Sequence, residues 1–192
     1  MFCRMRVAFF GGSFNPPHVA HQFVALYALE TAAVDELWLV PCAKHPFDKV
    51  LAPFDHRLRM CELAAAALGP RVRVSDIENR LGGESRTLVT LKALRAEHPD
   101  HAFQLVVGAD IEPELRLWYG ADELLRDVPR IVVGRSGFGR GDWLAMPAVS
   151  STEVRARLAR GQSVSHLVPR PVDAYIREHR LYADFPTVPS TC

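Results

Sequence analysis

The sequence predicts an α/β fold in which helices cover a parallel β-sheet. Short apolar runs rich in β-branched residues alternate along the chain with longer stretches of helical pattern. These runs are almost wholly hydrophobic, as expected of strands that are buried on both faces. Because parallel strands need a crossover helix between them, the alternation predicts a doubly wound, Rossmann-like sheet, followed by a small C-terminal helical segment.

The first half of the chain contains three of the expected strands. We predict strands at residues 6–11, 37–40 and 72–74, with helices at 19–33 and 55–68. The acidic pair Asp35-Glu36 precedes the second strand, and Gly69-Pro70 ends the second helix, because a glycine terminates helices and a following proline prevents their continuation.

The second half continues the alternation and then becomes helical. We predict a helix at 88–97, strands at 103–107 and 131–133, and C-terminal helices at 152–160 and 172–179. The glycine-rich segment 136–142 is expected to be a mobile loop, either a lid or a linker. We treat 1–192 as one domain, with the helical segment at about 150–183 and a poorly ordered tail at 184–192.

Composition excludes several classes of function. The 192 residues include 23 basic and 22 acidic side chains, a net charge of +1, so no overall field attracts nucleic acid or a membrane surface. No apolar run approaches the roughly 18 residues of a membrane span, and the first residues lack a signal-peptide core, so we expect a cytoplasmic protein. The four cysteines are scattered, which indicates neither a zinc site nor a disulfide framework.

The junction between the first strand and the first helix is the most informative part of the chain. Gly11 and Gly12 are expected to form a tight turn, and free N–H groups at the start of the helix favour an anion. His18 and His21 lie three residues apart and share a helix face. The sequence therefore predicts a phosphate site, the alternative being a turn whose histidines only cap or pack.

Other polar or glycine residues follow the later strands. Gly108 and Asp110 come after the strand at 103–107, and Gly134-Arg135 after the strand at 131–133. Because the carboxyl ends of parallel strands lie at one edge of the sheet, we expect these groups to share a ligand with the first loop.

A second polar motif opens the helix expected at 152–160. Ser150 and Glu153 have the spacing of a capping box, which by itself explains that pair as a helix start. Ser151, Thr152 and Arg155 are better placed to hold a triphosphate, with the guanidinium supplying bidentate contacts.

These two motifs carry a resemblance to a known family. The run Gly11-Gly12-Ser13-Phe14-Asn15-Pro16-Pro17-His18-Val19-Ala20-His21 resembles the first signature of the nucleotidyltransferase superfamily, and Ser150-Ser151-Thr152-Glu153-Val154-Arg155 its second. The segments Val107-Gly108-Ala109-Asp110, Leu167-Val168-Pro169 and Leu181-Tyr182, with Trp118, are similar to bacterial nicotinate mononucleotide adenylyltransferases.

The resemblance implies an enzyme of NAD biosynthesis. ATP and nicotinate mononucleotide would be joined to nicotinate adenine dinucleotide with release of pyrophosphate, and Mg²⁺ would be carried on ATP without a dedicated set of protein ligands. His18, His21 and Arg155 are the expected catalytic residues, stabilising charge in the transition state. The expected ATP-binding residues are Gly11, Gly12, Ser13, Phe14, Asn15, His18, His21, Gly108, Asp110, Arg135, Ser151, Thr152 and Arg155.

The expected mononucleotide-binding residues are Ser13, Lys49, Ser85, Arg86, Thr87 and Trp118. Taken alone, Trp118 reads as a core residue, whereas the resemblance implies that it stacks on the pyridine ring. Asp110 either caps a helix or accepts hydrogen bonds from a ribose.

The chain departs from the family pattern at several positions. Ala20 stands where the family has a glycine, Arg86 where it has a tyrosine, and Val89 where it has an aspartate. Residues 44–49 match the family pattern poorly, so Lys44 is a second candidate for the role assigned to Lys49. The alternatives are a sister adenylyltransferase acting on nicotinamide mononucleotide or phosphopantetheine, and a nucleotide sensor without turnover. The substrates are the only expected partners, and a homo-oligomer is left open.

Overall fold

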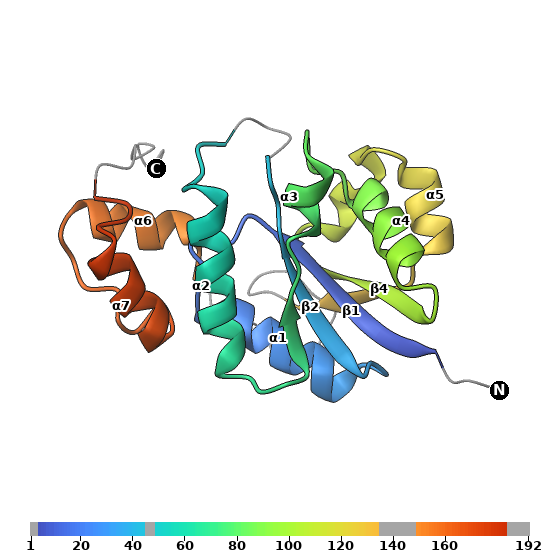
Figure 1. The fold of residues 1–192 in the computed structure, drawn as a ribbon, viewed down its shortest axis with the longest axis horizontal. Coiled ribbons are helices and arrows are strands. Elements are labelled where there is room, and N and C mark those ends of the chain that lie inside the picture. The colour runs from blue at the N-terminus through green and yellow to red at the C-terminus, as the bar shows by residue number, and fades with distance from the viewer. Residues whose placement is uncertain (1–3, 45–48, 135–148, 184–192) are drawn as a thin grey trace.

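The computed structural model describes residues 4–44, 49–134 and 149–183. Within them lies one sheet with the order β3-β2-β1-β4-β5, in which all neighbouring strands are parallel (Figure 1). The strands are β1 (Met5–Gly12), β2 (Glu36–Pro41), β3 (Val72–Val74), β4 (His101–Gly108) and β5 (Arg130–Val133). The chain moves outward from β1 to β3 and then returns to the other side of β1 for β4. This reversal confirms the predicted doubly wound sheet.

Helices connect the strands and follow the last one. They are α1 (Val19–Thr31), α2 (Phe54–Ala66), α3 (Ile77–Leu81), α4 (Thr87–Glu97), the 3₁₀ helix η1 (Glu112–Leu117), α5 (Ala121–Asp127), α6 (Ser151–Ala159) and α7 (Arg170–Glu178). The predicted helices and strands all occur, with ends displaced by no more than a few residues. The sequence prediction missed α3, η1 and α5, which are too short for a periodic pattern to identify them.

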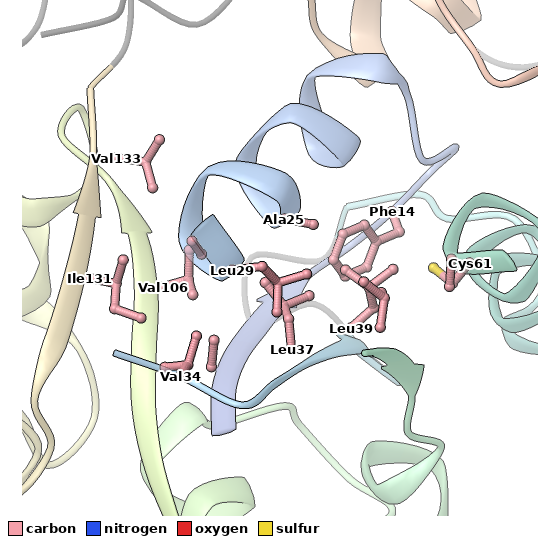
Figure 2. Close-up of a cluster of buried hydrophobic side chains, with 14 residues drawn as sticks. Phe14, Ala25, Leu29, Val34, Leu37, Leu39, Cys61, Val106, Ile131 and Val133 are labelled. Atoms are coloured by element: carbon pink, nitrogen blue, oxygen red, sulfur yellow. The ribbon is translucent and has the colours of Figure 1, made fainter. Parts of the chain in front are cut away.

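Alternate residues of each central strand face opposite helical layers, since side chains in a strand point to the two faces in turn. Ala8, Leu37 and Leu39 pack on the face covered by α1 and α2 (Figure 2), where Ala25, Leu29 and Cys61 meet them. The intervening residues pack under α3, α4, η1 and α5: they include Val7, Phe9, Trp38, Val40, Leu105 and Val107. Both faces of the sheet are therefore buried.

The C-terminal helices form a third apolar cluster against α2. Met60 and Ala64 of α2 contact Val154 of α6 and Val172 and Ile176 of α7. Figure 1 shows α6 and α7 beside α2, at the end of the molecule away from α4 and α5. The helical segment predicted from the sequence is thus packed on α2, and Ala20 of α1 also belongs to this cluster.

Some expectations are not settled by this architecture. None of the described helices combines the length and apolar character needed to cross a bilayer. The cytoplasmic location and the treatment of 1–192 as one domain stay predictions. The loop at 136–142 and the tail at 184–192 lie outside the described residues.

Candidate active site

A cavity of about 560 Å³ opens at the carboxyl end of the sheet, beside the adjacent central strands β1 and β4, between which the strand order reverses. Of the predicted site residues it is lined by Gly11, Gly12, Ser13, His18, His21, Lys49, Ser85, Arg86, Thr87, Gly108, Asp110 and Trp118. Phe14, Asn15, Ser151, Thr152 and Arg155 are not among the described residues that line it. Arg135 lies outside the described residues.

The glycine pair does not make the turn that the sequence suggested. Gly11 and Gly12 continue β1, and the backbone reverses at Phe14, whose φ of 43° is in the left-handed region. A Cβ at Gly11 would lie 2.9 Å from the ring of Phe9, and one at Gly12 would lie 3.3 Å from the ring of Phe14. The expected tight turn at the glycines is therefore wrong: both belong to the strand, where aromatic rings pack closely against them.

The two predicted histidines lie together at the start of α1. Their rings stack with centroids 3.7 Å apart, and His18 is buried. The backbone N–H of His18, which occupies the N-cap position, donates to Nδ1 of His21 at 3.0 Å. The ring of Phe14 meets His21 edge-on at a centroid distance of 4.9 Å. The His21 ring is thus held by a hydrogen bond from the His18 backbone and by contacts with the rings of His18 and Phe14.

The expectation that α1 offers free N–H groups to an anion needs correction. The N–H of Val19 donates to the carbonyl of Leu167 at 2.9 Å, and that of His21 donates to the carbonyl of His18. The turn before α7 therefore occupies the first donor of α1. One of the N–H groups expected to bind an anion therefore holds the C-terminal segment instead.

The side chain of Asn15 connects the first loop to two distant segments. Its Oδ1 accepts from the N–H of Ala52 and from the hydroxyl of Tyr182, each at 3.0 Å, and its Nδ2 donates to the carbonyl of Val50. Burial raises the pKa of the Tyr182 hydroxyl, which therefore stays protonated and able to donate. Asn15 is only 1% exposed, so its side chain holds the loop in place.

The second motif docks on the same loop. The hydroxyl of Ser150 caps α6 by accepting from the N–H of Glu153, as predicted. The Ser151 hydroxyl donates to the carbonyl of Pro16 at 2.9 Å, and Nη1 of Arg155 donates to the carbonyl of Asn15 at 2.7 Å. Thr152 is exposed and accepts from Arg155. The two sequence motifs are therefore in direct contact, 135 or more residues apart along the chain.

The opposite wall of the cavity comes from the segment before α4. The Ser85 hydroxyl accepts from the N–H of Ala43, and the Ser85 N–H donates to the carbonyl of Lys44. Arg86 pairs with Glu84 and lies over the ring of Tyr119 at 5.8 Å from its centroid. This segment is tied to the loop after β2, and the Arg86 guanidinium already has two partners.

Trp118 satisfies part of both sequence interpretations, whereas Asp110 does not cap the helix that follows it. Trp118 packs on the cluster beneath α4 and also lines the cavity. The helix η1 begins after Ile111, so Asp110 does not hold its N-cap position. A Cβ at position 108 would overlap the Asp110 carboxylate, which places this carboxylate against Gly108 at the cavity wall.

Sequence reasoning missed several residues of the site. Cys42, Glu78, Leu117 and Tyr119 line the cavity. Glu78 is buried and accepts a hydrogen bond from Thr90. An apolar flank on each side of Trp118 was visible in the sequence, but nothing local indicated that α3 would bring Glu78 to this wall.

No group of three or more His, Cys, Asp or Glu side chains that could hold a metal ion occurs among residues 4–44, 49–134 and 149–183. The carboxylates of the cavity wall, Glu78, Asp110 and Glu114, belong to three different elements or loops.

The chain is similar to known proteins over nearly all of its length. Residues 9–157 match the cytidylyltransferase-like family. A relative from Anaeromyxobacter sp., named "Probable nicotinate-nucleotide adenylyltransferase", is 50% identical over 183 residues, which cover 92% of this chain and 96% of the relative. A relative of the same name from Myxococcus xanthus is 43% identical, covering 93% and 95%.

Solved structures give the same fold. The nicotinic acid mononucleotide adenylyltransferase of Plasmodium falciparum, complexed with NaAD, has a TM-score of 0.81 at 22% identity, over 93% of this chain and 98% of that one. Together, the family match and the relatives' high identity over nearly their full length place this chain in the cytidylyltransferase-like family, among the nicotinate-nucleotide adenylyltransferases.

Proposed function

We propose that this protein transfers the adenylyl group of ATP to the 5′-phosphate of nicotinate mononucleotide. A phosphate oxygen of the mononucleotide forms a bond to the α-phosphorus of ATP. The bond from that phosphorus to the bridging oxygen breaks, and pyrophosphate leaves with its electron pair. The relatives named for this activity support the assignment, as does a cavity of a size suited to nucleotides.

One observation carries the proposal: a single cavity is lined by the paired histidines on one side and by Trp118 with residues 85–87 on the other. The first wall suits phosphates, and the second offers an indole face to an aromatic base. Two substrates bound at these walls would have their phosphates adjacent, which is the main requirement of a direct transfer.

The role that we assign to the histidines is stabilisation of charge. Because Nδ1 of His21 accepts from the backbone, the ring proton is on Nε2, which can donate to a phosphate oxygen without the ring being cationic. His18, stacked on it, would contact the same phosphates. Mg²⁺ bound to the triphosphate supplies further charge neutralisation. No general base is required, since the attacking phosphate monoester is already deprotonated.

Arg155, Ser151 and Thr152 have a supporting role in this proposal. They lie against the loop that carries Asn15 and Pro16, and not on the cavity wall. We assign them to the outer end of the triphosphate, which extends from the cavity toward the start of α6.

The proposal includes a preference for nicotinate over nicotinamide mononucleotide. Thr87 lines the cavity and is the first residue of the 11-residue helix α4, so the N-terminal N–H groups of this helix favour a carboxylate over an amide. Arg86 adds positive charge nearby, although it is shared with Glu84.

The decisive experiment is a pyrophosphate-release assay with ATP and each of three acceptors: nicotinate mononucleotide, nicotinamide mononucleotide and phosphopantetheine. We expect the highest kcat/KM with nicotinate mononucleotide. A ratio near one between the two pyridine nucleotides would contradict the proposed carboxylate recognition. Turnover with phosphopantetheine alone would assign the chain to the sister activity, and ATP binding without pyrophosphate release from any acceptor would make it a sensor.

A further inference from the structure

An arginine for which no role was predicted lies beneath the first loop. Arg57, near the start of α2, is only 1% exposed. Its Nε donates to the carbonyl of Ala52 at 2.9 Å, and its Nη1 to the carbonyls of Ser13 at 3.0 Å and Cys42 at 2.7 Å. Its Nη2 donates to the carbonyl of Ala43 at 3.3 Å. One guanidinium thus joins the loop after β1 to the loop after β2.

The carbonyls that Arg57 holds belong to the wall of the cavity, since Ser13 and Cys42 both line it. The preceding carbonyl, that of Gly12, accepts from the N–H of Cys42 at 2.9 Å. Two successive carbonyls of the first loop are therefore directed toward the β2 side. In a planar trans peptide the N–H points opposite to the C=O, so the N–H groups of Ser13 and Phe14 are turned the other way.

Burying a guanidinium is costly unless its donors are satisfied. Burial lowers the pKa of Arg57, but an arginine remains charged in a protein. Within the described residues Arg57 donates to four backbone carbonyls and also interacts with the Cys42 side chain, and none of these partners is a carboxylate that would neutralise its positive charge. An anion bound against Ser13 would experience that charge across a single peptide unit, in a region of low dielectric.

We propose that Arg57 is a positioning residue for phosphate binding: it orients the Ser13–Phe14 peptide toward the substrate phosphates and supplies a buried positive charge behind it. Lysine cannot replace Arg57 in this role, because a single ammonium group cannot donate to all the carbonyls that the planar guanidinium reaches. The inference rests on the proposed function for the identity of the phosphates, but the arrangement itself concerns any phosphate bound at this loop.

The other end of the sheet offers a matched control. Arg71 also donates to backbone carbonyls, those of Leu29, Val34 and Asp35, and it pairs with Glu30. It fastens a loop at the amino end of the strands, remote from the cavity. Arg57→Lys and Arg71→Lys therefore remove comparable loop contacts, and only the first lies under the phosphate site.

We expect Arg57→Lys to lower kcat/KM for both substrates by about 10- to 100-fold, because small displacements of a positioned phosphate are expensive in rate. Calorimetric titration with ATP, carried out well below the melting temperature, gives the concentration of ATP-binding sites, and the rates are expressed per site. A loss of folded protein alone then leaves kcat per site unchanged. Arg71→Lys should lower the melting temperature and leave kcat/KM within about twofold of the parent. A value for Arg57→Lys within about threefold of the parent would overturn the proposal.

A second measurement needs no variant and no turnover. The Nε–H resonance of Arg57 in the ¹⁵N-labelled parent protein is followed during titration with ATP and, separately, with adenosine. We expect ATP to shift this resonance and adenosine to leave it unchanged, with the Arg71 resonance unmoved by either. Equal responses to ATP and adenosine, or none to ATP at saturation, would refute the role of Arg57 whether or not the protein is an adenylyltransferase and whether or not Arg57→Lys folds.

Discussion

Several polar side chains at the carboxyl end of the sheet are buried, whereas two ion pairs between its amino-end loops are exposed. Asn15, His18 and Arg57 are each 5% exposed or less. At the amino end, Arg6 pairs with Asp35 and Arg71 with Glu30, and in both pairs each side chain is more than 40% exposed. Exposed pairs of this kind contribute roughly 0–1 kcal/mol each.

The difference indicates which end carries the function. A buried polar group is costly to desolvate and is retained where its position matters, while exposed ion pairs fasten loops at little cost. Each prediction below therefore compares a residue near the carboxyl end with a similar residue elsewhere.

The largest effect is expected from the histidines. His18→Ala should lower kcat by about 10²-fold or more while ATP binding changes much less, because the ring acts on charge that develops during transfer. The control is His98→Ala, from the histidine pair His98–His101 at the amino end of β4, whose rings lie 4.9 Å apart. That variant should retain kcat within about twofold. A kcat for His18→Ala within a few-fold of the parent would remove His18 from the catalytic residues.

Trp118→Ala should raise KM for the mononucleotide by roughly 5- to 150-fold and KM for ATP far less, since stacking and buried area contribute about 1–3 kcal/mol. Trp38, buried in the sheet with its Nε1 bonded to Glu36, is the control. Trp38→Ala should cost roughly 3–5 kcal/mol of stability and affect both substrates alike. If the two variants behave the same way, Trp118 is a core residue and does not stack on the substrate.

Arg155→Lys should raise KM for ATP by about tenfold, because one ammonium cannot hold the Asn15 carbonyl and a phosphate as the guanidinium fork can. Arg157 lies on the same helix and pairs with Glu153, so Arg157→Lys should leave KM for ATP unchanged. Steady-state kinetics with varied ATP make the comparison, and equal values for both variants would leave Arg155 with a purely structural role.

The smallest effect concerns the attachment of the C-terminal segment. Tyr182→Phe removes a buried hydrogen bond to Asn15 and should cost about 1 kcal/mol, or roughly 2–4 °C in melting temperature. The hydroxyl of Tyr175 bonds the half-buried His56, so Tyr175→Phe should cost less. Thermal denaturation of both variants tests this order. A larger loss for Tyr175→Phe would mean that α7 is held mainly by α2 and not by the first loop.

The elements of the sheet and their order in the chain could be predicted from the sequence because their causes are local. Runs such as 103–107 are apolar enough to be buried on both faces, and α2 ends at Ala66, shortly before Gly69, whose φ is 84°. The two polar motifs were also recognisable, since residue types and spacing define them. The prediction that they lie near one edge of the sheet followed from the parallel topology.

Tertiary structure decided how the parts of the site contact one another. Arg57 meets Ser13 across 44 residues, and Tyr182 meets Asn15 across 167, contacts that leave no periodic signal in either segment. The same reason explains two wrong expectations. Gly11 and Gly12 do not turn, because both pair with β2 as part of β1, and the first N–H of α1 is not available to an anion, because Val19 donates to Leu167. A local pattern specifies an element, but burial and hydrogen-bond satisfaction are properties of the packed chain.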